Sequence, residues 1–263
     1  MLPQIVLFGQ VIGLYWIMML IGVLAFGVYA VIIALKFKYD LMDMVMFFFI
    51  LSIGVLIGSH LLYALVNYEN FVYFLKNIKQ MKFFIALGNI FNGRMFYGGL
   101  LGALLTGFII IRKDNNYIKY FDIIAAGIPL FHFFAKIGCF LGGCCYGIQS
   151  KIGFIYYKST LTESNGIMRF PVQLLESFFC IILFIYISFL LINNKFKNKL
   201  LFLYLLIYSI GRFFIEYLRG DISRGIWFYL STSQIISILI ILFVLIRFLM
   251  IYKKHNNIKG ILI

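Results

Sequence analysis

The sequence predicts an all-α integral membrane protein. Of its 263 residues, 63% are hydrophobic and only 12% are charged, and the mean hydropathy is +1.02. Soluble globular chains carry about twice that share of charged residues, so the expected solvent is a bilayer. The chain has 31 phenylalanines and only three prolines, which is compatible with long helices that face lipid. Because no internal repeat or linker interrupts it, we expect residues 1–263 to form a single transmembrane domain.

Seven apolar stretches are long enough, or nearly so, to cross a membrane, since a transmembrane helix needs roughly 20 apolar residues. They are 11–35, 41–67, 95–111, 121–147, 171–192, 200–217 and 231–251. We therefore predict seven transmembrane helices. The first stretch has no basic segment before it and is too long for a signal peptide, so we expect it to remain as the first helix.

Lysine and arginine residues set the predicted orientation. The loops after the first, third, fifth and seventh stretches are short and rich in cations, which is typical of cytoplasmic loops. Their cations are Lys36, Lys38, Arg112, Lys113, Lys119, Lys195, Lys197, Lys199, Lys253, Lys254 and Lys259. The N-terminus is then outside and the C-terminus is cytoplasmic. Because most cations lie beside apolar segments, the net charge of +14 predicts contact with anionic lipid and no binding to nucleic acid.

The segment 68–94 is too long for a simple turn and mixes apolar side chains with lysines. Lys76, Lys79 and Lys82 recur every third residue, so they share one face of a helix. We predict an external amphipathic arm, a helix that lies on the outer membrane surface. The other sizeable external segment is 148–169, in which the Gly-Phe-Ile-Tyr-Tyr run at 153–157 indicates a short strand or turn.

Four cysteines lie in or beside apolar stretches: Cys139, Cys144, Cys145 and Cys180. Their spacing matches no common zinc site, and two of them are adjacent in sequence. Neither a metal site nor a disulfide framework is predicted, and no cofactor is expected.

The stretch 135–147 combines a cation with small residues in a segment expected to lie in lipid. Lys136 is followed by Gly138, Gly142, Gly143 and Gly147. A charge in hydrocarbon is costly, so it should face a cavity or a partner, and glycines allow close approach of a backbone or ligand. Lys136 is thus a candidate for holding a polar lipid headgroup. The alternative is that Lys136 extends to water at the helix end while the glycines pack helices.

Ionisable side chains inside apolar stretches are the further candidates for function: His60, His132, Lys136, Glu176, Arg212 and Glu216. In the sixth stretch, Tyr208, Arg212, Glu216 and Arg219 are spaced by four, four and three residues, which stacks them on one helix face. Arg212 and Glu216 can pair, and Lys136, Arg212 and Arg219 together could hold a phosphate. The alternative is an ion pair that only orients helices.

Two further stretches carry polar or small residues at helix positions. Gln173 and Glu176 share one face of the fifth stretch, just after Pro171, which suits a first helical turn. Gly98 and Gly99 open the third stretch, where packing between helices is the alternative reading.

These motifs, in this order, resemble the bacterial prolipoprotein diacylglyceryl transferases. They are Tyr97-Gly98-Gly99-Leu100, the segment 138–147, Arg-Phe-Pro-Val-Gln-Leu-Leu-Glu at 169–176, the series Tyr208, Arg212, Glu216 and Arg219, Gly225-Ile-Trp227, and Ser233-Gln234. The resemblance covers nearly the whole chain and implies a multi-pass transferase of the bacterial inner (cytoplasmic) membrane. That family moves the diacylglyceryl group of phosphatidylglycerol to the lipobox cysteine thiol of a preprolipoprotein, which forms a thioether and releases glycerol 1-phosphate. Phosphatidylglycerol, preprolipoprotein signal peptides and the lipid bilayer are the partners it implies.

The resemblance also implies roles for individual residues. Arg212 would polarise the phosphate leaving group, Glu216 would orient Arg212, and Tyr97 or Tyr208 would hydrogen-bond the glycerol ester. The implied substrate-binding residues are His60, Gly98, Gly99, Lys136, Gln173, Glu176 and Arg219. No nucleophile of the enzyme is required, but the acceptor thiol needs a base or a cationic field.

The chain departs from the family motifs in several places. Tyr97 stands where the family has histidine, Lys136 and His60 stand where it has arginine, and Cys139, Gly142 and Cys144 replace two asparagines and a glutamate. A lysine lacks the planar fork with which arginine grips a phosphate. Two alternatives therefore stay open: a divergent paralogue with another acceptor, and a non-catalytic membrane protein that binds lipid or peptide on the same scaffold.

Overall fold

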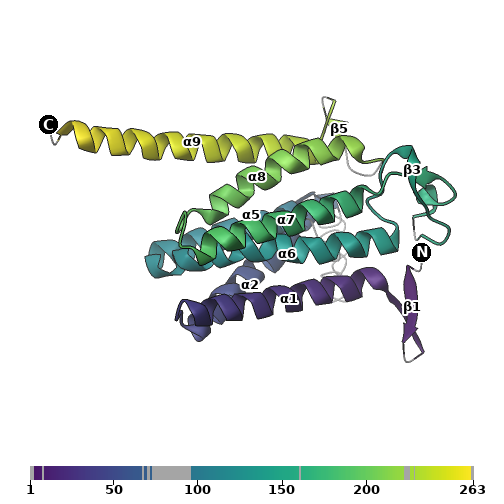
Figure 1. Cartoon of the computed structure of the whole chain (residues 1–263), viewed down its shortest axis with the longest axis horizontal. Helices are drawn as coiled ribbons and strands as arrows, with labels where there is room; N and C mark the ends of the chain where they lie inside the picture. The colour runs from purple at the N-terminus through teal and green to yellow at the C-terminus, as the bar shows by residue number, and fades with distance from the viewer. Residues whose placement is uncertain are drawn as a thin grey trace. The chain divides into compact units, whose positions relative to one another are not determined.

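The computed structural model consists mainly of long helices (Figure 1). It describes residues 3–7, 9–66, 68–69, 72, 96–159, 161–221, 226–227 and 229–261. The predicted amphipathic arm at 68–94 therefore lies almost wholly outside the described residues.

The long helices are α1 (Leu14–Lys36), α2 (Leu41–Val66), α5 (Phe96–Lys113), α6 (Ile118–Gly142), α7 (Val172–Ile192), α8 (Leu200–Ile215) and α9 (Thr232–Ile261). Among the described residues, six segments are long and apolar enough to cross a membrane: Leu14–Lys36, Leu41–Leu65, Asn115–Gly142, Val172–Ile192, Leu200–Leu218 and Thr232–Met250. The chain is therefore a multi-pass membrane protein. The third predicted stretch corresponds to α5, which is not among these six, so the count of seven stays a prediction.

The chain divides into two compact units. The larger comprises Met1–Ile33 and Phe121–Ile263, and the smaller comprises Ala34–Tyr120. The single domain predicted for 1–263 stays a prediction.

In the larger unit, α1, α6 and α7 run side by side (Figure 1). Gly138 on α6 allows α1 to approach, because a Cβ added there would lie 3.0 Å from the Cβ of Met18. The hydroxyl of Ser177 on α7 donates to the carbonyl of Phe133 on α6 at 3.0 Å. Apolar side chains and short polar bonds thus hold these three helices together, and α8 packs against both α7 and α9.

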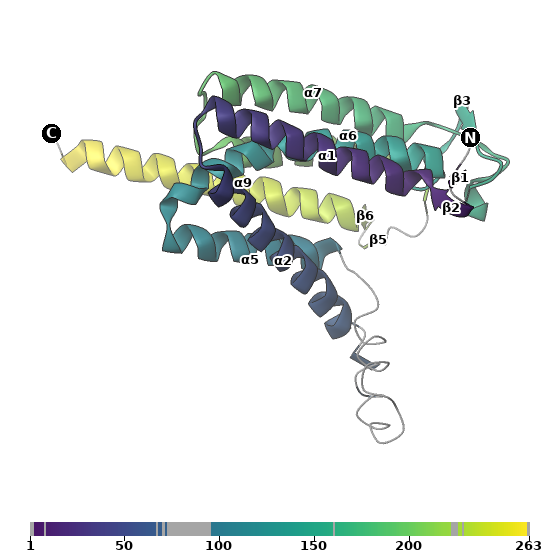
Figure 2. The same ribbon diagram turned by 90° about the horizontal axis from the view of Figure 1, so that it is seen from below.

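Two small antiparallel hairpins lie at one end of the larger unit, which we call the hairpin end (Figures 1 and 2). They are β1 (Gln4–Leu7) with β2 (Gln10–Gly13), and β3 (Gln149–Ile155) with β4 (Met168–Arg169). The short strand predicted within 153–157 is thus confirmed as the last part of β3. At this end α6 and α8 finish, and α1, α7 and α9 begin. A third pair, β5 (Ile226–Trp227) with β6 (Leu230–Ser231), directly precedes α9.

The predicted fourth span, 121–147, is too long at its C-terminal end, because α6 ends at Gly142. Gly143 has φ +75° and Cys145 has φ +53°, and these left-handed conformations cannot continue a right-handed helix. The chain then pairs with the segment after α8: the amide of Ile148 donates to the carbonyl of Leu218 at 3.0 Å. Cys144 and Cys145 are thus placed in a turn beyond the helix.

Asp122, near the start of α6, does not reach water. Its carboxylate is buried and accepts hydrogen bonds from the backbone amides of Asn198 at 2.5 Å and Leu200 at 3.1 Å. An acceptor of this kind satisfies amides that a helix start leaves unpaired. Asp122 therefore fixes the beginning of α8 against α6.

In the smaller unit, α2 and α5 cross through facing glycines. A Cβ added to Gly98 would collide with the carbonyl of Gly58, and one added to Gly102 would collide with the carbonyl of Gly54. Small residues that let backbones approach are typical of membrane helix pairs.

We expect Gly102→Ala to lower the thermal stability of the detergent-solubilised protein. The added methyl group overlaps the backbone of α2, and overpacking of this kind costs about 1–3 kcal/mol. Gly27→Ala on α1 is the matched control, because a Cβ there meets no atom within 4 Å. Melting temperatures measured by tryptophan fluorescence should fall for the first variant and not for the second. Equal melting curves would contradict the glycine contact between α2 and α5.

Candidate active site

Three helices of the larger unit join their charged side chains around Glu176. The ammonium of Lys136 on α6 lies 2.9 Å from Oε2 of Glu176 on α7, and Nη1 of Arg212 on α8 lies 3.5 Å from the same oxygen. Nη2 of Arg212 lies 2.6 Å from Oε2 of Glu216. We call these four residues the ion cluster.

Local sequence explains why the ion cluster lies near the hairpin end. Lys136 lies six residues before the end of α6, Glu176 is the fifth residue of α7, and Arg212 is in the last turn of α8. At about 1.5 Å of rise per residue, Lys136 lies roughly 9 Å from the end of its helix. The cluster therefore lies within about two turns of the helix ends.

The polar stripe predicted on the sixth stretch is confirmed for three of its four members. Arg212 and Glu216 form the predicted pair, and Glu216 begins the 3₁₀ turn η3 (Glu216–Leu218) that ends α8. One turn earlier, the hydroxyl of Tyr208 donates to Oε1 of Glu176 at 3.3 Å. On α9, the Ser233 hydroxyl accepts from Nη2 of Arg212 at 3.4 Å.

Burial makes this cluster electrostatically strong. Glu176 is 2% exposed, Glu216 is 1% exposed, and Arg212 is 9% exposed. Charges at such depth are tolerated only when they are paired, since the surroundings cannot solvate them. The alternative in which Lys136 extends to water is wrong for this structure, because the ammonium faces Glu176. The alternative in which the ion pairs only orient helices stays open.

The pairing leaves polar atoms without a hydrogen bond. Among the described residues, Nη1 of Arg212, Nδ1 of His132 and Oε1 of Gln173 are buried and make none, although Nη1 has the long ion pair given above. His132 lies one turn before Lys136 on α6 and faces the Tyr208 ring, with 5.4 Å between centroids. Buried polar atoms usually have a hydrogen-bond partner, which can be a ligand or a water molecule. Nη1 of Arg212 is the donor among these three atoms that can bind an anionic ligand.

Gln173 connects α7 to the turn beyond α6. Its Nε2 donates to the carbonyl of Cys144 at 2.8 Å and to the hydroxyl of Tyr156 at 3.1 Å. Burial raises the pKa of Tyr156 to about 12, so the hydroxyl stays neutral. Gln173 precedes Glu176 by one helical turn, and the side chain therefore positions the turn beside the ion cluster.

Arg219, which the sequence grouped with Lys136 and Arg212, has a different partner. Its Nε donates to Oδ1 of Asp221 at 2.8 Å, and its Nη2 contacts Oδ2 of the same carboxylate. Burial alone would lower the pKa of Arg219, but the hydrogen bond to Asp221 raises it above the ordinary value. The guanidinium fork is thus already filled, and two cations, not three, share the central carboxylate. The pairing of Arg219 with Asp221 was not among the predicted contacts.

The remaining predicted residues belong to the smaller unit. His60 lies on α2, and Tyr97, Gly98 and Gly99 lie in the first turn of α5, where the side chain of Tyr97 is outside the described part. Gly98 is in contact with α2, as its packing alternative predicted.

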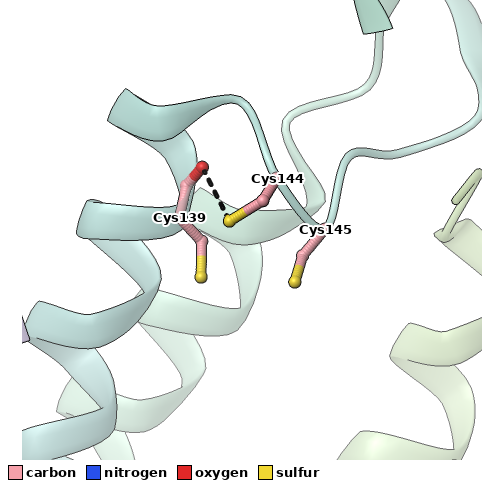
Figure 3. A group of neighbouring side chains, drawn as sticks. All are labelled: Cys139, Cys144 and Cys145. Atoms are coloured by element: carbon pink, nitrogen blue, oxygen red, sulfur yellow. Dashed lines mark hydrogen bonds between the residues drawn. The ribbon is translucent and has the colours of Figure 1, made fainter. Parts of the chain in front are cut away.

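Three thiols, which the sequence analysis did not group, lie together next to this site (Figure 3). Cys139 is one turn after Lys136 on α6, and Cys144 and Cys145 follow the helix end. Their sulfur atoms all lie within 4.8 Å of one another. The two positive φ values at 143 and 145 bring them together, and the glycine before the cysteine pair was the one available signal.

Over most of its length the chain is similar to one family of known proteins. The family described as "Prolipoprotein diacylglyceryl transferase" matches residues 3–251. A Clostridium perfringens protein named phosphatidylglycerol–prolipoprotein diacylglyceryl transferase 2 is 38% identical over 172 residues, which span 64% of each chain. A Clostridium tetani protein named phosphatidylglycerol–prolipoprotein diacylglyceryl transferase is 33% identical over 72% of this chain and 73% of its own length. A Helicobacter pylori (strain Shi470) protein of the same name is 31% identical over 86% of this chain and 82% of its own length.

We expect Glu176→Gln to destabilise the protein more than Lys136→Gln does. Loss of Glu176 leaves two buried cations facing each other, whereas loss of Lys136 leaves Glu176 paired with Arg212. Removing one partner of a buried pair costs about 3–5 kcal/mol. Thermal unfolding in detergent should rank the variants in this order, with Glu163→Gln near wild type because Glu163 is exposed between β3 and β4. A Glu176→Gln protein as stable as Glu163→Gln would refute a central part for this carboxylate.

Proposed function

The chain belongs to the prolipoprotein diacylglyceryl transferase family, and we propose that it is a phosphatidylglycerol–prolipoprotein diacylglyceryl transferase. Its donor is phosphatidylglycerol, and its acceptor is the lipobox cysteine thiol of a preprolipoprotein. It works in the cytoplasmic membrane of a bacterium, where both substrates enter from the bilayer.

The reaction needs an activated thiol and a stabilised leaving group. The acceptor thiol loses its proton to a base, and its sulfur attacks the glycerol carbon that carries the phosphate. A carbon–sulfur bond forms as the carbon–oxygen bond breaks, and the phosphate of glycerol 1-phosphate leaves with the electron pair. The phosphate thus gains a second negative charge in the transition state. Fixed cations accelerate such a step when they meet the charge as it develops.

The observation that carries the proposal is the pair of cations, Lys136 and Arg212, on one buried carboxylate. These cations come from different helices and reach the same oxygen of Glu176, so both can reach one phosphate placed there. Nη1 of Arg212 makes no hydrogen bond among the described residues, and it is a donor available to a phosphate oxygen. A charge-assisted contact of this kind is about twice as strong as a neutral one.

Phosphate binding replaces the pairing at Glu176. The phosphate takes the place of Oε2 of Glu176 against the two cations, while Glu216 keeps Arg212 oriented through Nη2. The released Glu176 carboxylate then accepts the proton of the acceptor thiol, which is mostly protonated at neutral pH. Tyr208, which donates to Oε1 of Glu176, orients this base. Tyr97 as a hydrogen-bond donor to the glycerol ester, and His60, Gly98 and Gly99 as substrate-binding residues, are roles that we carry over from the family resemblance.

The membrane arrangement completes the proposal. α5 is a further spanning helix, which brings the number to seven, and the N-terminus is outside. The amphipathic arm predicted at 68–94 lies almost wholly outside the described residues. The hairpin end of the larger unit then faces outward, since the chain enters α1 there. The ion cluster lies in the outer half of the bilayer, and the domain is a single one over 1–263.

We expect Lys136→Ala to lose most transfer activity and Lys136→Arg to retain it. Loss of one charged contact to phosphate costs about 1.5–3 kcal/mol, or roughly ten- to over a hundred-fold in rate. Arginine restores the charge with a bidentate fork. The measurement is incorporation of radiolabelled diacylglycerol from phosphatidylglycerol into a lipobox peptide, with membrane levels of each variant checked.

Lys151→Ala is the control for this assay, because Lys151 lies exposed on β3. Equal activity of wild type and Lys136→Ala would exclude the phosphate role. Wild type without any incorporation would instead favour the non-catalytic lipid- or peptide-binding protein that the altered motifs leave open.

We expect a fusion after Ile263 to place its reporter in the cytoplasm. Green fluorescent protein at that position should fluoresce, and alkaline phosphatase should be inactive. Phosphatase fused after Lys158, in the external segment, should be active and is the matched comparison. Phosphatase activity at the C-terminus would reverse the orientation and with it the outward position of the ion cluster.

A further inference from the structure

The turn beyond α6 gathers three sulfur atoms at one point (Figure 3). Cys139 lies in the last turn of α6, and the chain reverses through Gly143 at φ +75° and Cys145 at φ +53°. The sulfurs of Cys139, Cys144 and Cys145 consequently lie within 4.8 Å of one another, and all three thiols are free. Three thiols so close together, from two backbone segments of different conformation, are more than packing requires.

The spacing suits a single metal ion. Three thiolates that bind one Zn²⁺ at about 2.3 Å lie about 4 Å apart, so the observed separation closes with small side-chain rotations. A disulfide would use only two of the three sulfurs and requires them to approach to about 2 Å. Thiolate ligands select soft cations such as Zn²⁺ and Cu(I) over Mg²⁺ or Ca²⁺.

The surroundings supply support and access for an ion. The carbonyl of Cys144 accepts from Gln173, so a side chain on α7 holds the ligand-bearing turn. Cys144 also lines a cavity of about 550 Å³, whose walls are the β1–β2 hairpin, the start of α1 and Gly142. This cavity has no carboxylate in its lining and extends from the β1–β2 hairpin to Cys144, one of the three cysteines. A metal site must have enough ligands at the right spacing, hydrogen bonds that hold the ligand-bearing residues, and a path by which the ion enters.

We propose that Cys139, Cys144 and Cys145 form a binding site for one soft, thiophilic cation of the Zn²⁺ or Cu(I) class. The ion replaces the thiol protons, and its bonds fix the turn 143–147 against the end of α6. Because Lys136 precedes Cys139 by one turn, the ion also fixes the part of α6 that carries the ion cluster. The site forms whether or not the chain transfers a diacylglyceryl group.

The test titrates full-length, detergent-purified protein with Cd²⁺ after reduction and removal of reductant under argon. Thiolate-to-cadmium charge-transfer absorption should rise and saturate at one Cd²⁺ per chain. Cys145→Ser and Cys144→Ser should each weaken binding by at least about 10–100-fold, the loss that changes around metal ligands cause. Cys180→Ser is the matched control, because Cys180 is a buried free cysteine on α7 outside the cluster. It should bind Cd²⁺ like wild type.

A second measurement needs no variant and does not depend on the folding of any. X-ray absorption of Zn²⁺-loaded wild type should give three sulfur neighbours at about 2.3 Å. The proposal is overturned if Cys180→Ser binds as weakly as Cys145→Ser, or if the absorption edge reports mainly nitrogen and oxygen neighbours. It is also overturned if protein isolated without reductant, digested and examined by mass spectrometry, contains two of the three cysteines as a disulfide.

Discussion

The larger unit depends on a single carboxylate. Glu176 is buried on α7, and it is stabilised by cations from the helix before it in sequence and from the helix after it. Charges in apolar surroundings cost far more than surface charges when they lose a partner. Each of α6, α7 and α8 must therefore present one particular face to the others. The ion pairs fix the rotation of each helix about its axis. Without them, the apolar surfaces of these helices could pack in several rotations with similar energy.

The sequence could predict those features that depend on a single segment. The spans follow from length and hydropathy, and the Arg212–Glu216 pair follows from a spacing of four residues on one helix. The sequence could not predict Glu176 as the partner of Lys136, or Asp122 as the acceptor for the start of α8, because these contacts join distant segments. A helix that is apolar on all sides carries no pattern that tells which face meets protein and which meets lipid. Only the folded arrangement decides which cations share a carboxylate and which, like Arg219, pair elsewhere.

Most of the departures from the family motifs lie in one place, and the other two, Tyr97 and His60, belong to the smaller unit. Lys136, Cys139 and Cys144 all lie within the last two turns of α6 or just beyond them, and no such change affects Arg212 or Glu216. The smaller ammonium makes one ion pair with Glu176, where a guanidinium would form a fork. One asparagine and the glutamate have given way to the thiols of Cys139 and Cys144, which hydrogen-bond weakly and bind metals well, and the other asparagine has given way to Gly142. The changes are consistent with a coordinated replacement at the end of one helix, in which metal-ligating side chains take over from hydrogen-bonding ones.

Gln173 links the two parts of this region mechanically. It lies one turn before Glu176 on α7, and its amide holds the carbonyl of Cys144 in the thiol-bearing turn. A displacement of that turn therefore acts on α7 one helical turn before Glu176. A phosphate that displaced Glu176, as proposed, would act on the turn in return. Such coupling is reciprocal, because the same contact transmits both effects. An ion among the thiols would hold the turn, and hence Gln173, in one position. The carboxylate of Glu176, the proposed base, would then keep its position when the phosphate replaces it as the partner of Lys136 and Arg212.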